Sequence, residues 1–121
     1  MILVDTSVWV DHLRAGHPGL AQALDRGDVL GHPWVVGELA LGHLSRRPDI
    51  LGLLRNLPQA VVATVDELSV FTERHRLYGL RIGYVDVQLL ASTRLTPGAW
   101  LATNDKRLAA AASRLGVLAR I

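Results

Sequence analysis

Cysteine is absent from this chain of 121 residues. Without cysteine the chain can form neither a disulfide nor a thiolate metal site, so it needs no oxidising compartment. No basic leader precedes the apolar residues at the N-terminus, and no run approaches the ~20 uninterrupted apolar residues of a membrane span. We therefore expect a cytoplasmic protein with no membrane anchor.

Lysine is nearly absent too. Lys106 is the only lysine among the 13 basic residues, the others being arginines, and the formal net charge is +2. Arginine binds phosphate well because its planar fork donates two hydrogen bonds at once. The bias agrees with a nucleic-acid partner, although the base composition of a genome gives the same bias.

Two familiar site patterns are missing as well. The sequence has no glycine-rich phosphate loop of the G-x-x-x-x-G-K type, which argues against a nucleotide triphosphatase. Its five histidines show neither metal-ligand nor catalytic-triad spacing. We therefore expect surface positions, or hydrogen-bonded core positions, for His12, His17, His32, His43 and His75.

Short apolar runs alternate with amphipathic segments along the whole chain. Hydrophobic residues make up 50% of the sequence, enough for one compact core and a single domain over residues 1–121. The periodicity predicts strands at residues 2–4, 28–33, 60–65, 99–103 and 117–120. It predicts helices at residues 8–14, 20–26, 34–44, 49–57, 64–79, 84–95 and 105–116. This alternation indicates an α/β protein, a three-layer α/β/α sandwich around a mainly parallel sheet.

Four carboxylates stand out in this arrangement. Asp5 and Asp105 each follow a predicted strand, and the carboxyl ends of parallel strands meet at one edge of a sheet. Glu38 and Asp86 lie inside otherwise apolar helical runs. A carboxylate buried alone there costs several kcal/mol unless it pairs or binds a metal. We therefore expect all four at one site.

Each carboxylate also has a purely structural explanation. Asp5 is placed to cap a helix, Asp86 and Asp105 lie where a helix dipole favours negative charge, and Glu38 could pair with an arginine. Taken together these explanations lose weight, because four carboxylates at one edge repel one another and raise their own pKa values. A divalent cation removes that repulsion.

The type of cation follows from the donor atoms. Ligation by oxygen alone favours Mg²⁺ or Mn²⁺ over zinc. Such an ion lowers the pKa of a bound water and clamps a phosphodiester for in-line attack, so the predicted chemistry is phosphodiester hydrolysis. We expect Asp5 and Asp86 to hold the metal most directly, with Glu38 and Asp105 completing the site.

The spacing of "VDTS", "GEL", "VDVQLLAS" and "LATNDKRL" resembles that of the PIN-domain nucleases, and most closely the VapC-type toxins of bacterial toxin–antitoxin modules. The resemblance runs from Asp5 to the closing strand. It implies that the four carboxylates are the acidic metal site and that nearby hydroxyls orient them, namely Thr6, Ser7 and Thr103. Some relatives carry a further acid where this chain has Gly42, which leaves a second metal open.

The resemblance also implies partners. It suggests a homodimer, a cognate antitoxin protein, and structured RNA such as tRNA or ribosomal RNA as the substrate. Three basic residues flank the acids in sequence and are candidates for contacts with the RNA backbone, although a solvated helix face explains each one taken alone somewhat better: Arg81, Lys106 and Arg107.

The three tryptophans give separate expectations. Trp100 lies in a predicted strand, so we expect it in the core. Trp9 and Trp34 lie on predicted helices near the acids. We expect them in the core or at a protein interface, with stacking on a nucleic-acid base as the alternative.

Other classes of protein compete with this interpretation. A receiver-like signalling domain needs an acidic pair after the first strand, whereas Asp5 stands alone before Thr6. A phosphatase of the D-x-D type is disfavoured by Ser7. Two alternatives stay open, a housekeeping RNA-processing or DNA-cleaving PIN nuclease and a catalytically silent PIN-like module that binds a partner.

Overall fold

The sheet at the centre of the molecule has three parallel strands. The structure, a computed structural model, describes residues 1–121. Strand β1 (Ile2–Val4) lies between β2 (Val29–Leu30) and β3 (Trp100–Ala102). Leu3 pairs with Leu30 on one side and with Leu101 on the other. The parallel α/β architecture expected from the sequence is confirmed.

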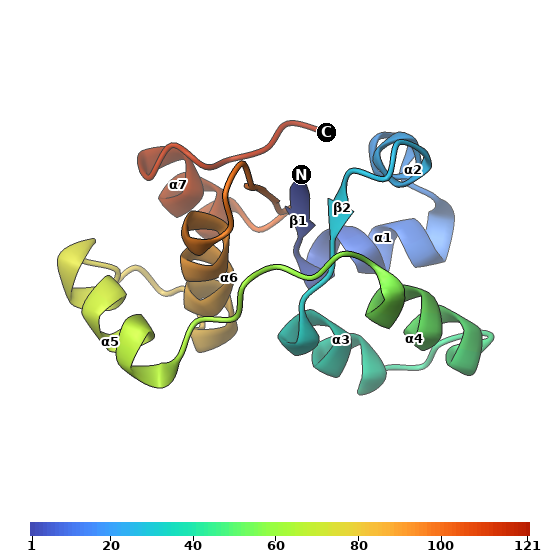
Figure 1. Cartoon of the computed structure of the whole chain (residues 1–121), viewed down its shortest axis with the longest axis horizontal. Helices are drawn as coiled ribbons and strands as arrows, with labels where there is room; N and C mark the ends of the chain where they lie inside the picture. Colours follow the sequence, from blue (N-terminus) through green and yellow to red (C-terminus); the bar gives the residue numbers. More distant parts are fainter.

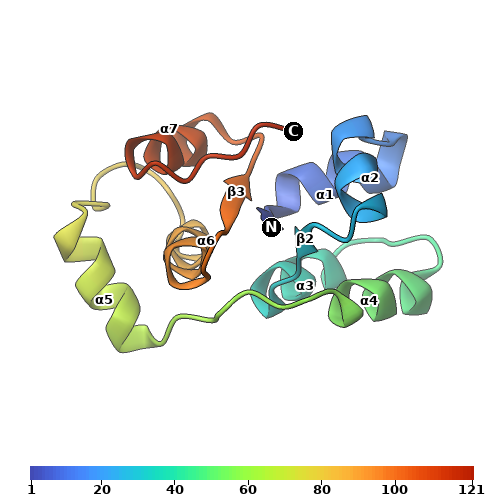
Figure 2. The same ribbon diagram turned by 45° about the horizontal axis from the view of Figure 1, so that its top comes forward.

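Seven helices cover this sheet from both sides. They are α1 (Thr6–Ala15), α2 (Pro18–Asp25), α3 (Pro33–Ala40), α4 (Arg47–Asn56), α5 (Val65–Arg74), α6 (Tyr84–Leu95) and α7 (Lys106–Arg114). Helices α1 to α4 lie on one side of the sheet and α5 to α7 on the other (Figures 1 and 2). None of the helices is long and apolar enough to span a membrane.

The core forms where β1 and α6 are enclosed by the other elements. Leu3 and Val4 are fully buried, as are Leu89 and Leu90 in the middle of α6. The burial of apolar area in this way is the main favourable term in folding. The sequence predicts the bounds of α6 correctly, because its apolar residues recur at helical spacing between Gly83 and the segment that contains Pro97.

The expected strand at residues 60–65 is wrong. This segment runs without a ladder, because side chains of the neighbouring region take its backbone hydrogen bonds. The Gln88 side chain accepts from the Ala63 N–H at 2.8 Å and donates to the Ala63 carbonyl at 3.0 Å. The Thr96 hydroxyl oxygen accepts from the Val61 N–H at 2.9 Å. The backbone groups of Val61 and Ala63 are therefore satisfied by side chains, without pairing to a neighbouring strand.

The expected strand at residues 117–120 is also wrong. It is reduced to one bridge pair, between Leu118 and Leu101. A similar isolated pair joins Gln59 to Gly31 at the opposite edge of the sheet. Both outer segments therefore run beside the sheet but leave it after a single residue.

Two helix ends also differ from the prediction. Helix α3 ends at Ala40 and not near residue 44, and α5 ends at Arg74, well before Gly79. The predicted capping box of α5 is confirmed, because Thr64 and Glu67 each accept a backbone hydrogen bond from the other residue.

His32 is the one histidine in the core, and its hydrogen bonds are satisfied. Its Nδ1 accepts the Trp34 N–H at 3.0 Å and so caps α3, while its Nε2 lies 2.9 Å from the Ser92 hydroxyl. Burial lowers the pKa of His32, partly offset by Gln88. The ring is therefore neutral, with its proton on Nε2, because Nδ1 must accept.

The tryptophans divide between core and surface. Trp9 is 5% exposed and lies in the core, whereas Trp34 is half-buried. Trp100 is 49% exposed, so its expected core position is wrong. It is the first residue of β3, next to the turn that follows α6.

Candidate active site

Asp5 directly follows β1 and is buried, with 6% of its surface exposed. Its backbone N–H donates to the Ala102 carbonyl at 2.9 Å, which continues the ladder with β3 by one residue. Its Oδ2 accepts hydrogen bonds from the Thr103 hydroxyl at 2.6 Å and the Ser7 hydroxyl at 2.8 Å. Its Oδ1 accepts none and keeps contact with solvent, since no buried side-chain oxygen lacks a partner. Asp5 is therefore oriented at one oxygen and free at the other.

The loop after β3 is fastened to the same hydroxyls. The Asn104 N–H donates to the Ser7 hydroxyl oxygen at 3.0 Å, and the Asp105 N–H donates to that of Thr103 at 3.0 Å. The Asp105 Oδ1 accepts the Leu108 N–H at 2.9 Å, so this exposed carboxylate caps α7. Asp105 thus lies at a helix start, as considered from the sequence, and the cap occupies one of its oxygens and leaves Oδ2 free.

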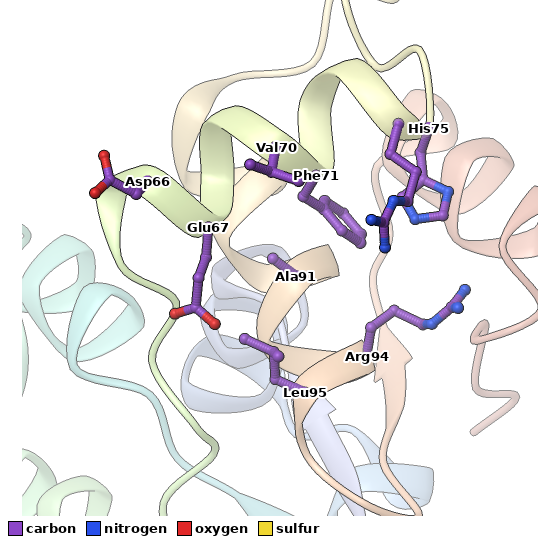
Figure 3. A pocket seen from close by; sticks show the side chains of 9 residues that line it. Asp66, Glu67, Val70, Phe71, His75, Ala91, Arg94 and Leu95 are labelled. Carbon is purple, nitrogen blue, oxygen red and sulfur yellow. The ribbon is translucent and has the colours of Figure 1, made fainter.

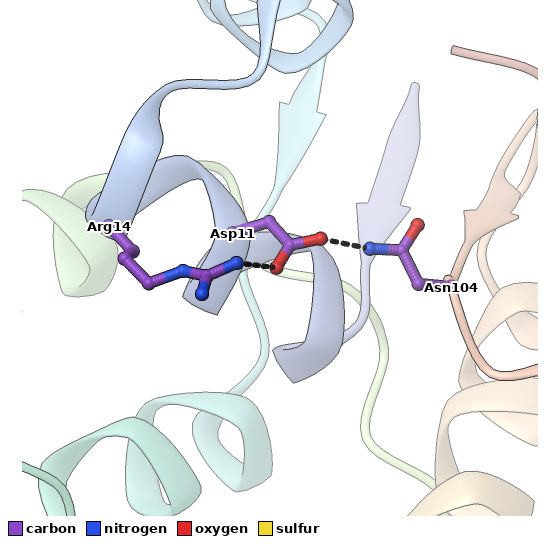
Figure 4. A network of polar contacts seen from close by, with 3 residues as sticks. All are labelled: Asp11, Arg14 and Asn104. Atoms are coloured by element: carbon purple, nitrogen blue, oxygen red, sulfur yellow. Dashed lines mark hydrogen bonds and ion pairs between the residues drawn. The ribbon is translucent and has the colours of Figure 1, made fainter.

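A polar contact that the sequence does not reveal holds this loop from the side of α1. The Asn104 side-chain amide donates to Asp11 Oδ2 at 2.7 Å, and Arg14 pairs with Asp11 Oδ1 at 3.5 Å (Figure 4). The hydrogen bond joins Asp11 in α1 to Asn104 in the loop after β3. The two residues are 93 positions apart, so no local pattern connects them.

Asp86 lies in the first turn of α6 and is half-buried. Its Oδ2 accepts the Gly83 N–H at 2.9 Å. Burial raises the pKa of Asp86, and the negative charges of Asp5, Asp105 and Glu38 raise it further, while the Gly83 hydrogen bond opposes them. The structure therefore brings Asp5, Asp105 and Glu38 within electrostatic reach of Asp86.

Glu38 is exposed, so the expectation that it is buried in an apolar helix is wrong. The buried residues of α3 are Val35, Val36 and Leu39, and with 3.6 residues per turn Glu38 lies at the edge of the face that they form, toward the half-buried Trp34. The Glu38 Oε1 accepts the Thr6 hydroxyl at 2.6 Å, which joins α3 to the first turn of α1. No arginine pairs with Glu38, because the three ion pairs of the chain lie elsewhere.

One feature is common to the four carboxylates. In each of them, one oxygen is hydrogen-bonded within the chain and the other is not. None has a lysine or arginine partner. Four negative charges are therefore gathered, oriented and left uncompensated, which is unfavourable unless a cation joins them.

The donor atoms suit a hard divalent cation. Carboxylate oxygens are the protein ligands of Mg²⁺ and Mn²⁺, and four are free here. No group of three or more acidic or histidine side chains forms a ready-made ligand set in this conformation. Glu38, Asp86 and Asp105 each keep one oxygen in a separate hydrogen bond. The oxygen donors of these residues thus fit the expected metal in their chemistry.

The predicted RNA-contacting residues lie around this site in sequence and are all exposed. Lys106 and Arg107 form the first turn of α7, directly after Asp105. Arg81 lies in the loop before α6 with a left-handed backbone, φ 58°. None of the three pairs with a carboxylate, so their guanidinium and ammonium groups are available to a ligand.

Two pockets flank the core, and only one touches the acidic site. A groove of about 700 Å³ between α1, α3 and the start of α4 includes Thr6 and Glu38 in its wall. A pocket of about 460 Å³ between α5 and α6 contains none of the four carboxylates (Figure 3). At its basic end burial lowers the pKa of His75, and Arg94, Arg74 and Arg114 lower it further. That pocket is separate from the acidic site.

The fold is that of a known family. The PIN domain model matches residues 2–114, and the chain belongs to the PIN domain family. The chain is also 49% identical over 117 residues to Ribonuclease VapC32 of Mycobacterium tuberculosis, found in the strains CDC 1551 and H37Rv. The match covers 97% of this chain and 94% of that relative. The resemblance inferred from the sequence motifs is confirmed.

Proposed function

We propose that this chain is a divalent-metal-dependent endoribonuclease that acts as the toxin of a type II toxin–antitoxin pair. The observation that carries the proposal is the set of four uncompensated carboxylates, each with one free oxygen. The similarity to Ribonuclease VapC32 supports RNA as the substrate and an antitoxin as the partner.

In the proposed mechanism Asp5 and Asp86 hold Mg²⁺ or Mn²⁺ most directly, and Glu38 and Asp105 complete the site. When bound, the ion supplies a water of lowered pKa and neutralises charge on the phosphodiester. The hydroxyls of Ser7 and Thr103 keep Asp5 Oδ2 engaged, so that its Oδ1 is the oxygen presented to the ion.

Other residues of the site have positioning roles in the same proposal. Thr6 donates to Glu38, and the Gly83 N–H donates to Asp86, so both carboxylates are oriented through one oxygen. The exposed side chains of Arg81, Lys106 and Arg107 contact the RNA backbone, where positive charge offsets the repulsion between phosphates and the acidic site.

The remaining parts of the proposal concern context. Residues 1–121 act as one nuclease domain, in a homodimer, on structured RNA of the tRNA or ribosomal RNA class in the cytoplasm. The groove beside Glu38 is apolar in part, with Val10, Leu13 and Leu39 in its wall. An antitoxin segment lying there would reach the acidic site directly.

Cleavage of labelled total RNA by the purified protein, free of antitoxin, tests the proposal. We expect discrete products in Mg²⁺ or Mn²⁺ that disappear with EDTA and with Asp86→Asn. Equal behaviour of the folded wild type and the variant on several RNAs and DNAs would contradict it and favour a partner-binding module. Expression of the chain without an antitoxin should arrest cell growth if it is a toxin, and should not if it is a housekeeping nuclease.

A further inference from the structure

Two aromatic rings from different helices meet at the surface beside the acidic site. Trp34 of α3 and Tyr84 of α6 have ring centroids 5.8 Å apart, with their planes inclined at 44°. Tyr84 is 56% exposed and Trp34 is half-buried. The pair therefore presents aromatic surface to solvent at a junction between two helices.

The position of this pair relative to the carboxylates follows from helix geometry. Trp34 lies four residues before Glu38, and side chains at that spacing share a helix face. Tyr84 lies two residues before Asp86 in the first turn of α6. Residues at that spacing do not share a helix face, so Tyr84 is placed beside the acidic site by its contact with Trp34, which shares a face of α3 with Glu38.

The rings are held from the core side and open on the other. The His32 ring, which is 1% exposed, meets Trp34 edge-on with centroids 6.3 Å apart. His32 also caps α3, so the start of this helix and the Trp34 ring are fixed together. A preorganised aromatic surface loses little conformational entropy when a flat ligand covers it.

We propose that Trp34 and Tyr84 form a stacking platform for an unpaired nucleobase next to the phosphodiester held at the acidic site. This inference rests on the proposed ribonuclease function and adds two positioning residues to it. Aromatic side chains stack on single-stranded bases, whereas bases inside a duplex have no free face. Trp34 and Tyr84 would therefore hold a base on one side of the cut and fix the register of the chain at the acidic site.

Binding of a short single-stranded oligoribonucleotide and of its abasic counterpart tests the platform. Fluorescence anisotropy is measured in Mg²⁺ with full-length protein carrying Asp86→Asn, which blocks cleavage and keeps the Gly83 hydrogen-bond acceptor. Added to it, Trp34→Leu or Tyr84→Leu is expected to weaken binding of the base-bearing oligonucleotide about tenfold. Neither should change binding of the abasic one.

Trp100→Leu is the matched control, because Trp100 is a comparably exposed ring on β3 that lies outside the acidic site. It should leave both affinities unchanged. Thermal melts check folding, and if Trp34→Leu does not fold, the exposed Tyr84→Leu variant decides. Unchanged affinity, or an equal loss on the abasic oligonucleotide, would overturn the platform.

Two further outcomes separate this inference from the proposed function. Loss of a dimer in either leucine variant, measured by sedimentation, would assign the rings to a protein interface and overturn the platform. Failure of the parent protein to bind any oligoribonucleotide would overturn the ribonuclease proposal and the platform with it. If the parent protein binds the oligoribonucleotide and both leucine variants bind it with the same affinity, only the platform is overturned.

Discussion

Asp86 is the carboxylate on which the electrostatic effects of the site converge. Its pKa is raised by burial and by the charges of Asp5, Asp105 and Glu38. A raised pKa means that the folded chain binds this proton more tightly than the unfolded chain does. The contribution to stability is present in full below the usual pKa of 3.8 and is lost as pH rises through the folded value. At neutral pH the ionised group therefore opposes folding.

Asp86→Asn tests this electrostatic cost. The asparagine oxygen still accepts the Gly83 N–H, and the charge is removed. We expect the Tm of the variant to exceed that of the wild type by a few degrees at pH 7 without divalent ions, and the difference to vanish near pH 3.8. Thermal melts across this range give the answer. A lower Tm for the variant at pH 7 would show that repulsion does not dominate.

The site carboxylates show which positions and contacts of single residues could be predicted from the sequence. Local signals placed Asp86 and Asp105 at the start of a helix, and both accept a backbone hydrogen bond there. Asp5 also lies at the expected N-cap position, but its side chain makes no cap hydrogen bond. The exposure of Glu38 was missed, because apolar neighbours in sequence do not tell which face of α3 a residue occupies. The contact between Asp11 and Asn104 was missed because it depends on tertiary structure alone.

At the scale of elements, α6 organises both the core and the site. Its first turn carries Asp86, and its middle buries Gln88, Ser92 and Thr93 among apolar residues. The Ser92 hydroxyl donates to Gln88 Oε1 at 2.8 Å. Gln88 therefore joins α6 to the segment that contains Ala63, and it also bonds to Ser92 one turn later in α6.

Gln88→Leu should destabilise the fold strongly. The variant removes the partner of the Ala63 N–H, the Ala63 carbonyl and the Ser92 hydroxyl in a fully buried position. Unsatisfied buried groups cost about 1–3 kcal/mol each, so we expect a loss of at least about 3 kcal/mol in urea unfolding. Thr96→Val, near the exposed end of α6, is the control, with a smaller expected loss. A loss below about 1 kcal/mol for Gln88→Leu would contradict the account.

The same hydrogen bonds explain which elements the sequence could predict. The helix at residues 84–95 was predicted correctly, because the helical spacing of its apolar residues is a property of the segment itself. The segment at residues 60–65 has the composition of a strand, but the partner of Ala63 is a side chain 25 positions later. Periodicity describes the segment itself and not what it pairs with, so the error there was unavoidable.

Over the whole molecule, charge is separated more sharply than the net charge of +2 suggests. The four carboxylates converge near the start of α6, and Arg74, Arg94 and Arg114 surround His75 near its end. Asp86 and Arg94 are eight positions apart, about 12 Å along the helix. A cation is therefore expected to bind at one end of α6 and not at the other.

The most direct test of this account is a calorimetric titration of Mn²⁺ into the antitoxin-free protein. We predict saturable binding to the wild type and none to a variant carrying Asp5→Asn and Asp86→Asn. Asp49→Asn is the matched control, because it removes an exposed carboxylate that pairs with Arg46 instead; it should bind Mn²⁺ as the wild type does. Absence of binding to the wild type, or equal binding to the Asp5 and Asp86 double variant, would contradict the assignment of a divalent-metal site to these carboxylates.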